Sequence, residues 1–151
     1  MAIFVINEWF WADSSGRNGQ TSQRQALDVI EKLARSQDQI VVIVGSAFDR
    51  KAWACCNSAD AYARRLAGAF HSVIRVNSER CRLVPIEDAA VLPEQLASTI
   101  NADDHYLVRA QLTIEGAVLV TTDAPLREAV QRAGLPCLSR EEFIGIAAVG
   151  S

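Results

Sequence analysis

The sequence predicts an α/β domain: a three-layer sandwich with a mainly parallel central sheet and helices on both faces. Two observations carry this prediction. Short apolar, β-rich runs alternate along the chain with segments of helical periodicity, a pattern typical of parallel strands joined by helices. The strand candidates are also apolar at consecutive positions, as expected for strands that are covered on both faces.

The composition is that of one globular domain. The chain has 151 residues, so residues 1–151 are expected to form one unit. Half of the residues are hydrophobic and 22% are charged, enough for both a core and a polar surface. The formal net charge of −3 argues against wholesale non-specific binding of nucleic acid. The four cysteines include no C-x-x-C pair, so no zinc site is expected.

The chain is expected to be cytoplasmic, without a membrane partner. Its longest apolar run, residues 40–44, is much shorter than the ~20 residues of a spanning helix. The N-terminal segment MAIFVINEW has neither a basic leader nor a small-residue cleavage pattern, so no signal peptide is predicted.

The first part of the chain reads as strand, helix, strand. Strands are predicted at residues 3–6 and 39–44, and residues 16–20 read as a glycine-bearing loop. The helix between the strands is predicted at residues 22–35. Its apolar residues recur at i, i+3, i+4 and i+7: Ala26, Val29, Ile30 and Leu33.

The middle of the chain reads as two helices and a strand pair. Residues 48–70 are predicted to be helical, with a break and an N-cap near residues 57–58. Residues 73–76 and 82–86 are short strand candidates in a hairpin-like arrangement. Pro93 suits the first turn of a helix that ends near Thr99.

The last third has the clearest pattern. A helix is predicted from Asp103 to residue 115, followed by a strand at residues 117–120. A helix then starts at Pro125 and ends at residue 134. A last strand at residues 135–138 precedes a closing helix capped by Ser139.

Polar side chains follow the predicted strands. Asn7 and Glu8 follow the first strand, Asp49 comes shortly after the second, and Asp123 follows the strand at residues 117–120. In open α/β sheets, ligands bind beyond the carboxyl ends of the strands. Converging carboxylates repel one another unless a cation lies among them, and oxygen-rich sites favour Mg²⁺ or Mn²⁺. Such ions activate water for phosphodiester hydrolysis.

The strings DDHYLVRA (residues 103–110) and GAVLVTTD (residues 116–123) resemble the PIN-domain family. In that family, an acidic residue opens a helix of the form D-x-H-h-h-x-x-A, and a strand ending in T-x-D follows about twenty residues later. The likeness is specific over residues 101–139. Over the first half of the chain, only the order strand–helix–strand agrees.

The resemblance implies a PIN-like fold and a metal-dependent endoribonuclease that acts on RNA. It also implies a toxin of a toxin–antitoxin pair, with a small antitoxin protein as partner. Asp103 is the best match to the helix-opening acid, because Ala110 then falls at the family's small position, and Asp104 is the alternative. Asp123 matches the strand-end acid, and Thr121 matches the hydroxyl two residues earlier.

Two of the family's four acidic positions differ here. Asn7 stands where the first acid is expected, with Glu8 as a substitute, and Lys51 stands at the second position, with Asp49 as the nearest acid. The resulting candidates for catalysis are Glu8, Asp103, Asp104 and Asp123. The candidate metal ligands are Asn7, Asp49, Asp103 and Asp123. These departures also support an alternative: a degenerate PIN-like module that binds nucleic acid or protein.

Several candidates also have simpler interpretations. Asp123 is a good N-cap for the helix that follows, and capping can coexist with metal ligation. Arg50 and Lys51 are candidate phosphate contacts, as is the hydroxyl of Thr121. The segment of residues 9–11, Trp-Phe-Trp, suggests packing first, or an interface with an antitoxin or with a second copy in a homodimer.

Overall fold

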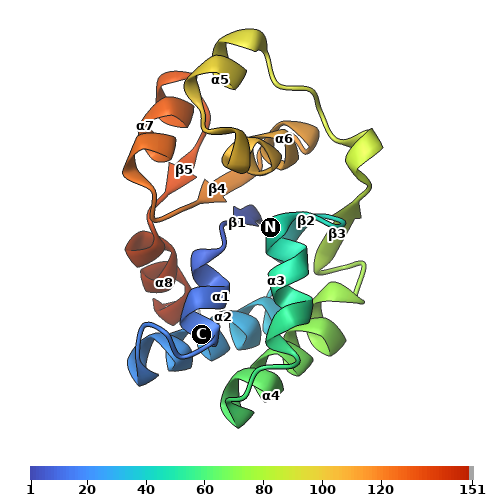
Figure 1. The fold of residues 1–151 in the computed structure, drawn as a ribbon, viewed down its shortest axis with the longest axis vertical. Helices are drawn as coiled ribbons and strands as arrows, with labels where there is room; N and C mark the ends of the chain where they lie inside the picture. Colours follow the sequence, from blue (N-terminus) through green and yellow to red (C-terminus); the bar gives the residue numbers. More distant parts are fainter. Residues whose placement is uncertain (150–151) are drawn as a thin grey trace.

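A five-stranded, all-parallel sheet forms the centre of the molecule (Figure 1). The computed structural model describes residues 1–149, so Gly150 and Ser151 of the predicted 1–151 domain lie outside the described residues. The strands are arranged in the order β3-β2-β1-β4-β5. They are β1 (Ile3–Ile6), β2 (Gln39–Ile43), β3 (Cys81–Val84), β4 (Val118–Val120) and β5 (Cys137–Leu138).

Helices cover both faces of this sheet, so the predicted three-layer α/β class is confirmed. Below the sheet in Figure 1 lie α1 (Trp9–Ser14), α2 (Gln20–Arg35), α3 (Ala47–Cys55), α4 (Ala61–Ala69) and α8 (Arg140–Val149). Above it lie α5 (Glu94–Thr99), α6 (His105–Thr113) and α7 (Ala124–Arg132). Three shorter helices complete the chain: η1 (Phe70–Arg75), η2 (Ile86–Asp88) and η3 (Ala102–Asp104).

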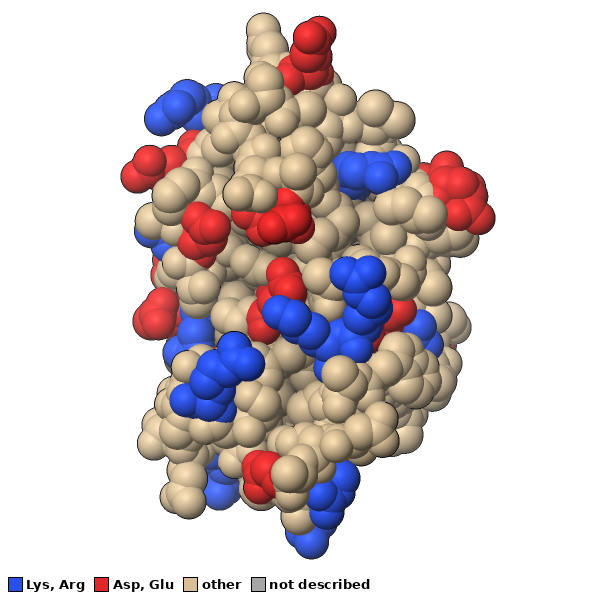
Figure 2. Space-filling view, viewed as in Figure 1, with Lys and Arg blue, Asp and Glu red and all other residues tan. Residues whose placement is uncertain are grey.

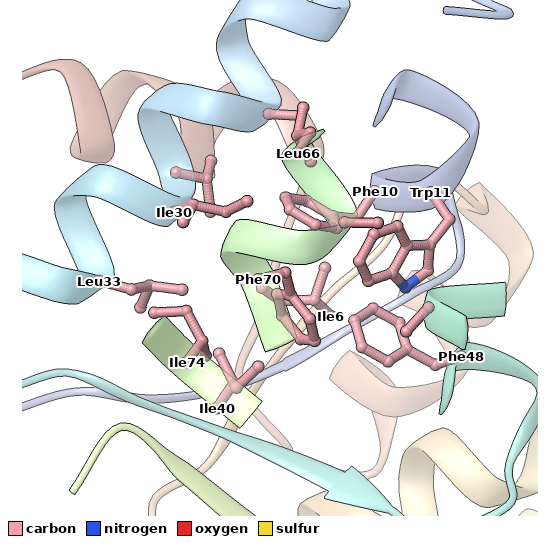
Figure 3. Close-up of a cluster of buried hydrophobic side chains, with 14 of the residues drawn as sticks. Ile6, Phe10, Trp11, Ile30, Leu33, Ile40, Phe48, Leu66, Phe70 and Ile74 are labelled. Atoms are coloured by element: carbon pink, nitrogen blue, oxygen red, sulfur yellow. The ribbon is translucent and has the colours of Figure 1, made fainter. Parts of the chain in front are cut away.

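Alternate strand residues point into two cores, one on each side of the sheet. Phe4 and Ile6 belong to the core under α1 to α4 and α8, whereas Val5 belongs to the core under α5 to α7. Residues 9–11 are in the first core, where they are 1–7% exposed. Figure 3 shows Phe10 and Trp11 among the other apolar side chains of this core. The Phe10 and Trp11 rings pack edge to face at 5.0 Å. Packing is thus the role of this segment, and the suggestion that it binds a partner or a second copy is wrong because the rings are buried.

The structure differs from the sequence prediction in the middle of the chain. Residues 73–76, predicted as a strand, belong largely to η1, a π-helix that continues α4. Ile74 is fully buried there and Arg75 forms an ion pair with Asp49, so tertiary contacts override the strand preference of the β-branched residues. In consequence β3 is not part of a hairpin but pairs in parallel with β2. Helix α1 is an element that the sequence did not predict.

The strand order creates a switch point at β1. From β1 the chain goes to β2 and β3 on one side and then to β4 and β5 on the other. The connections leaving β1 and β4 therefore diverge, and their carboxyl ends flank the crevice in which open α/β sheets bind ligands. Of the helices within residues 1–149, none combines the length and apolarity needed to cross a bilayer.

Candidate functional site

The carboxyl ends of β1 and β4 are tied together by side chains. Ile6 pairs with Val120, and the Asn7 amide donates to the carbonyl of Val120 at 3.0 Å. The Asn7 Nδ2 donates to Thr121 Oγ1 at 2.9 Å, and its Oδ1 accepts the Glu8 amide at 2.6 Å. Both polar atoms of the Asn7 side chain thus have partners within the protein, so they hold the strand ends rather than lie ready as metal ligands.

Thr121 positions the acid that follows it. The residue is fully buried, and its Oγ1 accepts the Asp123 amide at 3.1 Å in addition to the Asn7 side chain. A substrate cannot reach the Thr121 hydroxyl at this burial, so the predicted substrate contact is replaced by a positioning role. Sequence spacing identified the residue but not this role.

The Asp123 side chain caps α7 through one of its two carboxylate oxygens. Its Oδ1 accepts the Leu126 amide at 3.1 Å, which confirms the predicted N-cap. The carboxylate is half-buried. Because a carboxylate has two oxygens, the second can face the crevice while the first caps the helix.

Asp104, and not Asp103, has the more central position among the acids. Burial raises the pKa of Asp104, and the negative charges of Asp123, Glu8 and Asp103 raise it further, in that order. The acids that follow β1 and β4 and those that precede α6 are therefore near enough for their charges to act on one another. The short helix η3 places Asp104 as the residue directly before α6, half-buried, whereas Asp103 remains exposed.

Glu8 closes the other side of the site together with two basic residues. The Lys51 ammonium lies 2.7 Å from Glu8 Oε1. A hollow of about 530 Å³ lies beside this ion pair, and it is lined by Arg50, Asp103 and Tyr106, among others. Figure 2 shows acidic and basic side chains next to each other at the middle of this face of the molecule. Helix α1 is held here by the Trp9 indole, which donates to the carbonyl of Val120 at 3.1 Å.

Tyr106 is a residue of this site that the sequence did not reveal. Its hydroxyl is buried and has no hydrogen-bond partner of regular geometry among the described residues. Burial raises the pKa of the Tyr106 hydroxyl, and the nearby charge of Glu8 raises it further. No local pattern could have identified this contact, because Glu8 lies far away along the chain.

Asp49 is not part of the acidic rim, which corrects the predicted metal set. It is 3% exposed, and its carboxylate accepts two hydrogen bonds from the Arg75 guanidinium, at 2.9 and 3.2 Å. The Gly45 amide also donates to it, at 3.0 Å. Residues two apart on a helix face different directions, so Lys51 points to Glu8 while Asp49 points into the fold.

The donors at the rim suit a hard divalent cation in chemistry and in charge. Carboxylate oxygens are the preferred ligands of Mg²⁺ and Mn²⁺, and the carboxylates of the rim (Glu8, Asp103, Asp104 and Asp123) outnumber the two cations beside them, Arg50 and Lys51. Within the described part of the chain, no three Asp, Glu, His or Cys side chains already form a ligand cluster. Binding an ion would therefore require these side chains to move together.

The sequence was compared with models of protein families and with curated proteins. No family model matches the sequence, and no curated protein matches it either.

Proposed function

We propose that the chain is a PIN-like, Mg²⁺- or Mn²⁺-dependent endoribonuclease whose acidic centre consists of Glu8, Asp103, Asp104 and Asp123. The observation that supports the proposal is that Asp123, Glu8 and Asp103 lie near enough to Asp104, at the switch point of the sheet, for their charges to raise its pKa. Three stretches that are distant in sequence supply the carboxylates. Such a concentration of negative charge is costly for a fold unless a cation shares it.

Each residue of the site has a separate proposed role in phosphodiester hydrolysis. Asp104, Asp123 and Asp103 would hold the metal, with Glu8 joining them, and the ion would supply charge neutralisation at the phosphate and a more acidic water. Arg50 lines the same hollow and can contact a neighbouring phosphate.

Isothermal titration with Mn²⁺ and cleavage of a labelled RNA test this proposal. Asp123→Asn is the principal variant, because asparagine caps a helix as well as aspartate does and the fold is therefore kept. We expect the wild type to bind Mn²⁺ and to cleave RNA, and Asp123→Asn and Asp104→Asn to lose both. The control is Asp88→Asn, which removes an exposed carboxylate from η2. Equal cleavage by the wild type and Asp123→Asn would refute the assignment.

A binding module is the second candidate, and two contacts favour it. Asn7 uses both of its side-chain polar atoms within the protein, and Lys51 already pairs with Glu8. A PIN-like domain without a metal would bind RNA or a protein through the same rim. The absence of heat from Mn²⁺ with wild type and Asp123→Asn alike, combined with RNA retention on a filter, would establish this alternative.

If the chain is a toxin, its antitoxin is expected to cover the acidic rim with basic side chains. Co-purification with a small basic partner, lost when Asp103 and Asp104 are both changed to asparagine, tests this expectation. Self-association is a separate matter, and sedimentation of the purified chain distinguishes a monomer from a homodimer.

A further inference from the structure

Trp53 differs from the other two tryptophans of the chain in its exposure. Trp9 and Trp11 are 7% and 3% exposed, whereas Trp53 on α3 is 50% exposed. A tryptophan in this position keeps a large apolar ring in contact with water, and exposed aromatic rings are enriched where proteins bind their ligands. The Trp53 indole is therefore a surface on which a flat ligand can pack.

The exposed indole is held in place by η1. The His71 ring stacks on it with the ring centroids 3.9 Å apart and the planes at 27°, and the Arg75 guanidinium carbon lies 5.0 Å from the indole centroid. Both supports are themselves fixed, because His71 Nε2 donates to the carbonyl of Ala52 at 3.1 Å and Arg75 is paired with Asp49. A ring that is already ordered binds a ligand at a lower cost in conformational entropy.

Basic residues gather in the same part of the chain. Residues 50–82 contain seven Lys or Arg and two Asp or Glu, whereas the whole chain has 15 and 18. Figure 2 shows basic side chains on the lower half of this face, over the helices α3 and α4. Arg50 is exposed and lies three residues before Trp53, on the same face of α3. Arg50 also lines the hollow of about 530 Å³, so a cation and a ring follow one another along α3, leading away from that hollow.

We infer that this outer face of α3 binds single-stranded RNA, with a base stacked on Trp53 and a neighbouring phosphate paired with Arg50. Proteins that hold single strands combine positive charge for the backbone with aromatic rings for the bases. The bases of a duplex are already stacked on one another and cannot cover the indole. Charge favours RNA over a protein partner, because an apolar protein contact would not require the basic residues around the ring. The inference rests on the proposed function in taking RNA as the ligand, but it needs no metal.

Fluorescence titration in EDTA tests the stacking without any metal. Because Trp9 and Trp11 are buried, quenching by an added oligonucleotide reports mainly on Trp53. We expect a single-stranded RNA of about 10 nucleotides to quench this fluorescence, and the duplex of the same sequence to bind much more weakly.

Variants measure the contribution of the ring by fluorescence anisotropy of a labelled RNA. Trp53→Ala should bind about fivefold more weakly or worse, and Trp53→Phe should bind more tightly than Trp53→Ala because it keeps an aromatic ring. Tyr62→Ala is the matched control, since it removes a 37% exposed ring from α4 and should leave the affinity unchanged. Arg50→Met should reduce the slope of log K against log salt by about 0.7, the value for one phosphate contact on a single strand.

Equal RNA affinity for the wild type and Trp53→Ala overturns the inference, and so does the absence of RNA binding in EDTA. Cleavage of RNA in Mn²⁺ by the same wild-type protein would leave the proposed function standing in either case. Self-association in sedimentation that is lost in Trp53→Ala, with RNA affinity unchanged, would instead assign the ring to a protein interface.

Discussion

Replacing Asp104 by asparagine should make the metal-free protein more stable while it abolishes Mn²⁺ binding. The Asp104 side chain is half-buried, and its pKa is raised by burial and by the charges of Asp123, Glu8 and Asp103. Asp104 caps no helix with its side chain, so asparagine removes the repulsion without removing a hydrogen bond that the fold needs. Functional sites commonly store such repulsion at the expense of stability.

The size of this effect follows from the exposure of the site. Because the carboxylates border on solvent, the repulsion is screened and its relief is worth about 0.5–1 kcal/mol. For a chain of 151 residues, that stabilisation raises Tm by about 1–4 °C. The sign depends on pH: a carboxyl whose pKa is raised on folding contributes stability when protonated, and this contribution is lost as the pH rises through the raised value. The advantage of Asp104→Asn should therefore be absent near pH 3 and fully developed at pH 7.

Thermal unfolding at pH 3, 5 and 7, in low and high salt, checks this reasoning. Asp88→Asn is the control for the loss of one exposed carboxylate and should leave Tm within about 1 °C. High salt should reduce the gain for Asp104→Asn, because the Debye length shortens to about 3 Å at 1 M. A lower Tm for Asp104→Asn than for the wild type at pH 7 would show that the acids do not converge as described.

Three further predictions concern the frame of the site. Asp13→Ala should destabilise the protein by about 1–3 kcal/mol in urea titration, because the 1% exposed Asp13 accepts hydrogen bonds at 2.7 Å from both the Arg140 guanidinium and the Asn18 amide; an unchanged midpoint would contradict this role. Phe10→Ala should lower the free energy of unfolding by about 3–5 kcal/mol in the same assay, because Phe10 is 1% exposed and packs against other aromatic rings. A soluble variant of unchanged stability would instead support a surface role for residues 9–11. Asn7→Leu should destabilise the protein by about 1–3 kcal/mol in the same assay, because it removes the hydrogen bonds that the side chain makes to Thr121 Oγ1 and to the Glu8 amide; an unchanged midpoint would show that residue 7 does not hold the strand ends together.

The order of helices and strands could be predicted because each element depends mainly on residues that are close together in the sequence. The β-branched residues 40–43 form a strand that is buried on both faces, and the apolar stripe of α2 buries one side of a helix. Asp123 as an N-cap also depends only on its immediate neighbours. These features of the sequence determined the parallel sheet, its helical layers and the acid at the end of β4.

Only the tertiary structure decided which side chains meet. The short helix η3 determines whether Asp103 or Asp104 lies nearer to Asp123 and Glu8. The sequence alone does not show which of these two neighbouring residues takes that position. Asp49 and Lys51 are two residues apart, yet one is sealed against Arg75 and the other reaches Glu8. Residues 73–76 became helical because burial of Ile74 and the pairing of Arg75 outweigh strand propensity. Each outcome is a contact between segments that are distant in sequence, and the free energy of such a contact exists only once the chain has folded.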